Sequence, residues 1–399
     1  MGNIIEILSI QGGLEWGPAI PQYFFFTGIS AAAFLISSLT YVFGREHFRP
    51  IAGLALILAF TVLLAAPLNL VADLAQPGRF YSLFYRIHLT SPMSWGVFLL
   101  TFYPLLIAVE GLFGFRAGFA RRGQHSRGWR LTLYKWLSLG QLQVTPQTET
   151  RDHRVSKVLG IVGIPTAIAV HGYTGFILYF AVGRPLWATP LMPVIFLVSA
   201  VVSGLALMIL LTWLMVPNAD GKPRWSLMDR LGILLGWTII VDLSLRILWH
   251  GLSYLSDPVA YRPVLAFLFG EQFVESVIIE LGLALILPAF VMLVPAVRRI
   301  RLLFLISAFL TTVGVWLFRW STVIGGQEIP KVAAGFNDFA ISWFGGKGLL
   351  QVIGNWGIWL FLFILFTSFL PWRIDEVGGV KPARDTHVDE VTVGLGGGR

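Results

Sequence analysis

Long apolar blocks separated by polar links dominate the chain. Each block has about twenty residues or more, the length that an α-helix needs to cross the roughly 30 Å hydrocarbon core of a bilayer. The runs are uninterrupted and lack the alternation of outer-membrane barrel strands, so they predict helices. The nine predicted spans are Gly17–Phe43, Ile51–Ala72, Ser91–Phe115, Val155–Val182, Leu191–Val216, Leu227–Tyr254, Phe273–Val294, Leu302–Ile324 and Leu349–Leu370. The predicted fold is an all-α, polytopic transmembrane helix bundle.

The links between the blocks define the expected domain organisation. Residues 1–372 are expected to form a single transmembrane domain, and residues 373–399 a flexible cytoplasmic tail. The link over residues 116–157 is long and basic, and its segment Trp129–Leu137 mixes basic and aromatic residues as interfacial helices do. The stretch Tyr261–Gly270 is too short to cross the bilayer and is expected to be a loop or an interfacial turn.

The low charge content excludes several classes of protein. Only 13% of the 399 residues are charged, whereas a water-soluble domain carries about 25%. A soluble enzyme, a nucleic-acid-binding protein and a disordered scaffold are therefore excluded. The net charge of +8 has a different cause, because 21 of the 29 basic residues fall on one side of the predicted bundle and 6 on the other. Since cytoplasmic loops collect Lys and Arg, we predict the N-terminus outside and the C-terminus in the cytoplasm.

The sequence contains no cysteine. Disulfides, thiolate metal sites and an iron–sulfur cluster held by this chain alone are therefore excluded. If the protein handles electrons, they pass through an organic cofactor, a haem on histidines, or the clusters of a partner. The first residues, MGNIIEILSIQGGLEWGP, lack a basic segment and a small-residue cleavage site, so no removable signal peptide is expected.

Polar side chains gather at the predicted outer ends of the helices. A carboxylate, an imidazole and a phenol near one membrane surface suit quinone chemistry, because the head-group oxygens need hydrogen-bond partners that also accept protons. A tyrosine at a helix end is commonly an interfacial belt residue, whereas an intramembrane His or Asp is by default a hypothesis for a functional site, because burying it unpaired is costly. The residues are Gln22, Tyr23, Asn69, Asp73, His171, Tyr173 and His250 in helices, and Arg79, Arg184 and Trp187 in links.

The same segments resemble the NrfD/PsrC family, the membrane subunits of polysulfide reductase and related complexes. The resemblance is carried by Asp73-Leu-Ala-Gln-Pro-Gly-Arg79, Ser91-Pro-Met-Ser-Trp-Gly96, His171-Gly-Tyr173 and Arg184-Pro-Leu-Trp187, with Arg319-Trp and Gly325-Gly-Gln-Glu328 resembling a later helix end. Two positions depart from the polysulfide reductase subunit. Tyr23, next to Gln22, stands where that subunit has a quinone-contacting histidine, and Ala75 stands where it has an acidic residue.

The resemblance implies roles for individual residues. Tyr173 matches the family's quinone-binding tyrosine and is expected to hydrogen-bond the quinone. His171 projects about 200° away from Tyr173 on a regular helix, so it is expected to face another helix and support Asp73 or Asn69, with Asp73 accepting protons. The predicted site therefore has Asp73, His171 and Tyr173 as catalytic residues, and quinone contacts from Tyr23, Gln22, Asn69, Arg79, Tyr173, Trp187 and His250.

A second set of charges lies in the later helices. Asp242 and Arg246 are four residues apart, share a helix face and can neutralise each other. Glu280 lies near the middle of the seventh predicted helix, and Arg319 lies toward the outer end of the eighth. These residues predict either structural ion pairs or a proton path, because both need paired charges that face the bundle interior.

The resemblance implies a quinone-reactive membrane anchor subunit of a respiratory oxidoreductase, in the cytoplasmic membrane of a bacterium or archaeon. Menaquinol or ubiquinol is expected to react at the outer ends of the helices over residues 17–216, with additional helices over 227–370. Electrons are expected to pass to a periplasmic ferredoxin-like subunit with 4Fe-4S clusters and then to a molybdopterin catalytic subunit, with no metal or haem in this chain. The reverse direction is open, and the sequence does not determine the terminal substrate.

Two other classes stay open. A b-type cytochrome needs paired axial histidines at one depth on facing helices, and His171 and His250 are both near outer helix ends. A secondary transporter fits the buried charges and the helix-breaking segments Gly163-Ile-Pro165 and Leu287-Pro288, but no internal repeat pairs these segments.

Overall fold

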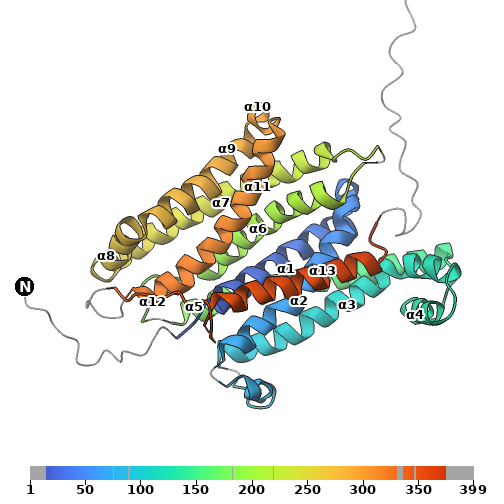
Figure 1. Cartoon of the computed structure of the whole chain (residues 1–399), viewed down its shortest axis with the longest axis horizontal. Helices are drawn as coiled ribbons and strands as arrows, with labels where there is room; N and C mark the ends of the chain where they lie inside the picture. The colour runs from blue at the N-terminus through green and yellow to red at the C-terminus, as the bar shows by residue number, and fades with distance from the viewer. Residues whose placement is uncertain are drawn as a thin grey trace, which may run out of the picture.

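A computed structural model of the chain describes residues 15–74, 76–88, 90–181, 183–218, 220–329, 336–345 and 347–373. Within these residues, nine helices are long and apolar enough to cross a membrane, which confirms the all-helical prediction. They run alongside one another in Figure 1. They are α1 (Ala19–Tyr41), α2 (Arg49–Asp73), α3 (Pro92–Gln124), α5 (Pro146–Tyr179), α6 (Met192–Met215), α7 (Trp225–Ser256), η4 with α9 (Val274–Ile286 and Leu287–Leu293), α11 (Arg301–Trp320) and α13 (Leu349–Phe369).

Shorter helical elements connect the spans or extend them. Figure 1 shows α4 and α10 at one end of the bundle and α8 and α12 at the other. The short elements are η1 (Glu46–Phe48), η2 (Pro77–Phe84), α4 (Trp129–Leu137), α8 (Pro258–Ala266), η3 (Phe267–Glu271), α10 (Pro295–Arg298), η5 (Ser321–Gly325) and α12 (Gly326–Glu328).

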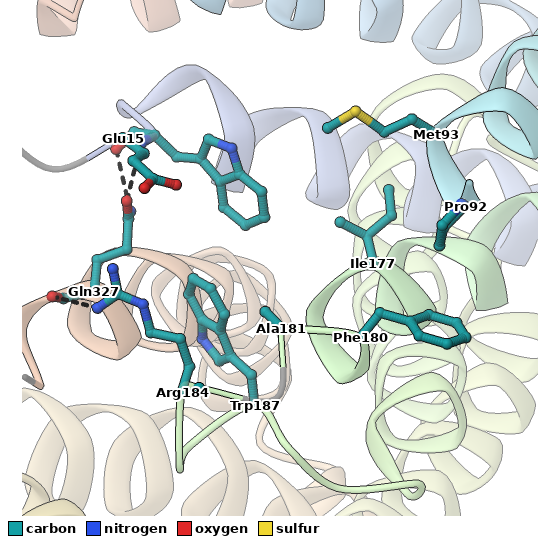
Figure 2. Close-up of a pocket in the computed structure, with 11 residues that line it drawn as sticks. Glu15, Pro92, Met93, Ile177, Phe180, Ala181, Arg184, Trp187 and Gln327 are labelled. Atoms are coloured by element: carbon teal, nitrogen blue, oxygen red, sulfur yellow. Dashed lines mark hydrogen bonds between the residues drawn. The ribbon is translucent and has the colours of Figure 1, made fainter. Parts of the chain in front are cut away.

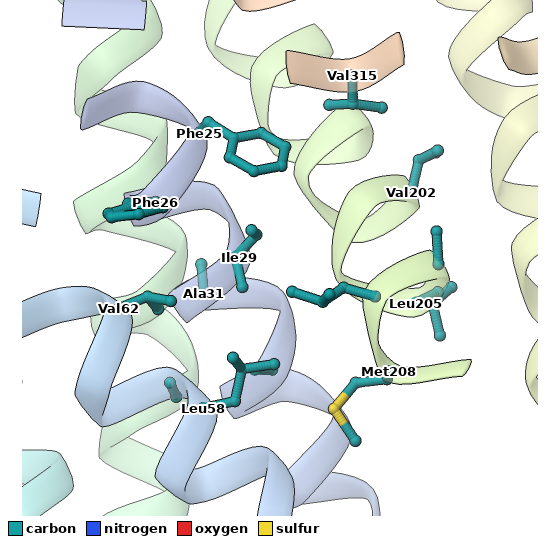
Figure 3. Close-up of a cluster of buried hydrophobic side chains, with 14 of the residues drawn as sticks. Phe25, Phe26, Ile29, Ala31, Leu58, Val62, Val202, Leu205, Met208 and Val315 are labelled. Atoms are coloured by element: carbon teal, nitrogen blue, oxygen red, sulfur yellow. The ribbon is translucent and has the colours of Figure 1, made fainter. Parts of the chain in front are cut away.

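Helix α1 lies in the interior of the bundle. It is apolar on every side and nearly all of its residues are buried, as expected for a helix without a solvent-facing stripe. Figure 3 shows its side chains between those of α2 and α6. The approach of α6 depends on Gly204, where a Cβ atom would lie 2.2 Å from the Ala32 Cβ. Small residues allow such close packing between membrane helices.

The outer helices expose apolar side chains. Leu105 on α3, Ile247 on α7 and Phe361 on α13 are each more than half exposed. Hydrocarbon is as apolar as these side chains, so exposure to it carries no hydrophobic cost. The outer surface of the bundle is therefore suited to contact with lipid.

The basic segment over residues 116–157 is mostly helical, which differs from the long loop expected there. Helix α3 continues to Gln124 and α5 begins at Pro146, where Thr145 accepts a hydrogen bond from the Thr148 amide and caps the helix. A buried ion pair between Arg116 and Asp152 joins the two extensions. A prediction from hydropathy places each helix end at the last apolar residue. It therefore misses polar turns that are stabilised by ion pairs with a neighbouring helix.

Three other expectations can be compared with the structure. The helix expected over Trp129–Leu137 is present as α4, and its interfacial position stays a prediction, whereas the stretch Tyr261–Gly270 is helical in α8 and η3 and is not a loop. Pro165 lies inside α5, which runs through it without a break. Residues 374–399 lie outside the described residues, so the flexible tail over 373–399 stays a prediction, as does the orientation of the bundle.

Candidate functional site

Two tyrosine hydroxyls meet inside the bundle. Tyr23 on α1 and Tyr173 on α5 are both buried, and their hydroxyl groups hydrogen-bond to each other. Helix α3 reaches this tyrosine pair at Gly96, where a Cβ atom would lie 2.8 Å from the Tyr173 hydroxyl oxygen. The missing side chain at Gly96 is therefore what lets the Tyr173 ring lie against α3.

A cavity of about 470 Å³ lies one helical turn from the tyrosine pair. Its walls include Pro92, four residues before Gly96, and Ile177, four residues after Tyr173. Residues four apart share a helix face and are separated by about 6 Å along the axis. Figure 2 shows Pro92, Met93, Ile177 and Phe180 on one side of the cavity and Arg184, Trp187 and Gln327 on the other. The lining is mostly apolar with a few polar groups, as is typical of small-molecule sites.

Two stacked tryptophans form part of the cavity wall that contains Arg184, Trp187 and Gln327. The rings of Trp16 and Trp187 lie 5.4 Å apart and are nearly parallel. Trp187 donates its indole N–H to the Thr322 carbonyl oxygen at 2.6 Å. The Gln327 side chain accepts from the Trp16 amide at 2.9 Å and donates to the Trp16 carbonyl at 3.2 Å. The start of the described chain, the link after α5 and the end of α12 thus meet at this wall.

Arg184 ties the same wall together through charge-assisted hydrogen bonds. It donates to the carbonyl oxygens of Gly326, Gln327 and Ile329 at 2.9–3.4 Å, and its guanidinium lies over the Trp187 ring. Burial lowers the pKa of Arg184, and the nearby Glu15 carboxylate opposes that shift. Both Arg184 and Glu15 line the cavity, which therefore has a cation and a carboxylate at its polar edge.

His171 is fully buried in the bundle interior. Its Nε2 lies 2.8 Å from the Phe196 carbonyl oxygen, and its Nδ1 lies 3.4 Å from the Thr27 hydroxyl. Arg319 lies 3.3 Å from the same Nε2 and donates to the Phe196 carbonyl and the Ser199 hydroxyl. Each ring nitrogen of His171 is therefore engaged with a protein group.

A charged cluster continues from Arg319 into α7 and η4. Arg246 pairs with Asp242 at 2.7 Å and also with Glu280. The Phe318 ring contacts both guanidinium groups, with the Arg246 carbon 3.7 Å and the Arg319 carbon 5.3 Å from its centroid. Two carboxylates and two guanidiniums sum to zero net charge, which fits burial in a membrane. The expected ion pair between Asp242 and Arg246 is confirmed, with Glu280 as an additional partner.

The sequence comparison decides the family. A family model described as "Polysulphide reductase, NrfD" matches residues 9–331, more than three quarters of the chain. The chain belongs to the NrfD family. The matched range includes both tyrosines, both walls of the cavity and Gln327, and it ends before α13.

Several NrfD-type relatives match over most of their length. The chain is 34% identical to a selenate reductase subunit of Mesobacillus selenatarsenatis, over 96% of this chain and 93% of that protein. It is 24% identical to a tetrathionate reductase subunit of Salmonella typhimurium, over 92% of this chain and 95% of that protein. It is 22% identical to the menaquinone reductase integral membrane subunit of Nitratidesulfovibrio vulgaris, over 76% of this chain and 70% of that protein.

The structure separates Asp73 and Asn69 from His171. Asp73 accepts a hydrogen bond from the Gly17 amide at 2.9 Å, and Asn69 donates to the Ala66 carbonyl of its own helix. The expected support of Asp73 or Asn69 by His171 is therefore wrong. The helices that contact the His171 side chain are α1, α6 and α11, whereas the two polar residues of α2 lie elsewhere.

The other predicted quinone contacts occupy different positions. Gln22 accepts from the Trp316 indole at 2.6 Å and so faces α11, whereas Trp187 lines the cavity. His250 and the Tyr261 hydroxyl form a hydrogen bond of 2.7 Å. Arg79 is exposed in η2. The structure thus brings Tyr23, Tyr173 and Trp187 to one region and leaves His250 at the α7–α8 junction.

Sequence reasoning missed three residues that shape the site. Trp16 forms part of the cavity wall, Gly96 admits the Tyr173 ring, and Phe196 offers its carbonyl to both His171 and Arg319. Trp16 carried a signal, because Glu15-Trp-Gly-Pro18 places an aromatic residue directly before a helix. A backbone carbonyl such as that of Phe196 leaves no mark in the sequence.

Proposed function

We propose that this chain is the quinone-reactive membrane subunit of a multi-subunit oxidoreductase. The observation that carries the proposal is the tyrosine pair one turn from the cavity between α3 and α5. Tyr173 is 7% exposed and Tyr23 is fully buried, so Tyr173 is the more accessible residue of the pair. We assign the hydrogen bond to a quinone oxygen to Tyr173 and the relay behind it to Tyr23.

The lining of the cavity fits a quinone head group. Met93, Ile177 and Phe180 provide apolar contacts for a ring, and a volume of about 470 Å³ lies within the usual size of a small-molecule site. A quinol supplies two electrons and two protons when it is oxidised. A hydroxyl donates one hydrogen bond while accepting another, so the tyrosine pair can pass a proton inward without holding a charge.

The route beyond the tyrosines leads to the charged cluster. Thr27, one turn from Tyr23, contacts His171, which contacts Arg319, and the Phe318 ring links Arg319 to Arg246. We propose that the Thr27 hydroxyl and the His171 imidazole carry the proton on the side of the tyrosines, that the two guanidiniums set the electrostatic potential of the cluster, and that Glu280 is the protonatable group of the cluster. Asp73 lies at the rim, because its partner Gly17 adjoins Trp16 of the cavity wall, and we propose that it accepts protons on that side.

The electrons are proposed to leave through partner subunits. This chain has no cysteine with which to hold an iron–sulfur cluster, and two of its relatives are named as one subunit of a reductase. We propose a periplasmic ferredoxin-like subunit against the rim formed by Glu15, Trp16, Arg184 and Gln327, followed by a molybdopterin catalytic subunit. The relatives are named for different acceptors, so we assign the choice of acceptor to the catalytic partner.

Replacing Tyr173 with phenylalanine tests the proposal. Tyr173→Phe removes one hydroxyl and little volume, so the purified complex should assemble normally but oxidise quinol about tenfold more slowly, as expected for a lost hydrogen bond of ~1.4 kcal/mol. Tyr179→Phe makes the same change six residues further along α5 and should leave the rate unchanged. A wild-type rate for Tyr173→Phe in a steady-state quinol oxidation assay would place the pocket elsewhere.

A further inference from the structure

A buried carboxyl group lies on α3, about 21 Å along the helix from Gly96, which contacts the tyrosine pair. Glu110 is 1% exposed, and neither of its carboxyl oxygens has a hydrogen-bond partner among the described residues. It lies inside the apolar run of α3, five residues before that run ends at Phe115. The proposed function does not use Glu110 or the part of the bundle around it.

The surroundings of Glu110 determine the charge that it carries. An ionised carboxylate in an apolar environment is very costly unless it is paired, and such a group takes up a proton instead. The acids of the charged cluster are paired with a guanidinium, whereas Glu110 interacts electrostatically with the phenols of Tyr41 and Tyr103, which supply no positive charge. The Arg49 guanidinium, which interacts with the Tyr41 phenol, pairs with Glu46. Glu110 is therefore a neutral carboxylic acid at this position.

Polar side chains on α5 lead from Glu110 toward the end of the bundle. A Cβ atom at Gly160 would lie 3.6 Å from Glu110 Oε1, so the carboxyl group faces α5 at this position. Ser156 comes four residues before Gly160, and Asp152 comes four residues before Ser156. Residues four apart share one helix face at steps of about 6 Å. Both polar residues of this row are buried, so the row lies inside the bundle.

The Ser156 hydroxyl supplies the step next to Glu110. Gly114, one turn after Glu110 on α3, faces it: a Cβ atom at position 114 would lie 3.9 Å from the Ser156 oxygen and meets no other atom of the described residues within 4 Å. The hydroxyl has no hydrogen-bond partner among the residues that the structure describes. A hydroxyl donates one hydrogen bond while it accepts another, and water bridges buried polar groups where there is room. A proton can therefore pass at this step.

The row reaches the aqueous phase at Asp152. The Asp152 carboxylate pairs with the buried Arg116, and its other oxygen lies 3.4 Å from an Arg151 nitrogen. The Arg151 side chain is 47% exposed, so this end of the row is open to water. The three polar residues Glu110, Ser156 and Asp152 thus connect a neutral acid inside the apolar run to a charged group at the end of the bundle.

We infer that Glu110 is an intramembrane proton-binding site that exchanges its proton with the aqueous phase through Ser156 and Asp152. The exchange moves a proton between oxygen atoms and needs no electron donor or acceptor. The site lies on the opposite half of α3 from the tyrosine pair, so the inference does not depend on the proposed quinone site. It gives the chain a place to take up or release protons on the membrane side to which the Arg116 end of α3 points.

Infrared spectroscopy of the purified complex in H₂O and D₂O tests the inference, because a protonated carboxyl and a carboxylate absorb at different frequencies. The difference spectrum between the wild type and Glu110→Gln should contain the carbonyl band of a protonated carboxyl, and this band should shift in D₂O. Ser156→Ala should slow the shift at least about tenfold, since a positioned group that passes the proton is lost. Ser203→Ala is the matched control, because its buried hydroxyl already donates to the Ala200 carbonyl of its own helix. It should leave the rate unchanged.

Dicyclohexylcarbodiimide gives a second measurement that needs no variant. The O–H of a protonated carboxyl adds across one C=N bond of this apolar reagent, and the adduct rearranges to a stable N-acylurea that peptide mass spectrometry locates. The wild-type complex should carry this label on Glu110. Absence of both the label and the protonated-carboxyl band would overturn the proton-binding site. A band that does not shift in D₂O, or that shifts at the wild-type rate in Ser156→Ala, would overturn the exchange route.

Discussion

Gly96 determines where the Tyr173 ring lies. A Cβ atom at position 96 would come within 2.8 Å of the Tyr173 hydroxyl oxygen, which is closer than any real Cβ contact. An alanine there has to push the ring away from α3, and the ring carries one half of the tyrosine pair. The position of the hydroxyl is thus controlled by a residue that has no side chain.

Gly96→Ala is expected to slow quinol oxidation about tenfold, since displacing a positioned hydroxyl by even an ångström costs about as much as removing its hydrogen bond. Gly172→Ala is the control, because a Cβ atom there meets nothing within 4 Å, and its helix should gain up to about 1 kcal/mol. Both variants are compared by quinol oxidation rate and by thermal unfolding of the purified complex. Equal rates would show that the Tyr173 ring does not need α3.

At the same scale, the sequence predicted some partners and missed others. Tyr173 was predicted because its neighbours resemble a family segment, and Tyr23 because of its register in the first helix. The partner of His171 was predicted wrongly, because helical periodicity gives the direction of a side chain but does not identify the helix that it faces. The Phe196 carbonyl and the approach of Gly96 depend on how helices pack, so they required the structure.

Among the elements, the nine spans were predictable because each contains a continuous apolar run, whose side chains either pack inside the bundle or face lipid. The ends of α3 and α5 were not predictable in this way. Their last turns are polar and are stabilised by pairing across the two helices, as with Arg116 and Asp152. The stretch from Tyr261 continues as helix because it leads directly into the next span.

The charged cluster gives a prediction that separates structure from proton transfer. Arg246→Leu leaves Asp242 and Glu280 buried without their shared partner, which costs about 3–5 kcal/mol, so the yield of assembled protein should fall sharply. Glu280→Gln keeps an oxygen that accepts from Arg246 but cannot take a proton. It should lower the yield less than Arg246→Leu does, because Asp242 still pairs with Arg246, and per assembled complex it should oxidise quinol at the wild-type rate and reduce proton movement in liposomes. Unchanged proton movement would assign Glu280 a structural role alone.

The orientation of the whole molecule can be determined with introduced thiols, because the chain has no cysteine of its own. A Cβ atom at Gly78 in η2 meets nothing within 4 Å, and Asp220 is exposed in the link before α7. We expect a membrane-impermeant maleimide to label Gly78→Cys in intact cells and Asp220→Cys only after permeabilisation. The reverse pattern would invert the topology that the basic residues predict.

The link between Trp16 and Gln327 has a consequence for the time course of synthesis. The two residues are 311 positions apart, and a ribosome adds about 5–20 residues per second, so roughly 15 to 60 seconds separate their appearance. During that interval Trp187 lacks its carbonyl acceptor at Thr322, and Arg184 lacks all three of its carbonyl partners. The first helices therefore enter the membrane with one wall of the cavity missing, and a chain that stops before α12 contains both tyrosines but not the complete pocket.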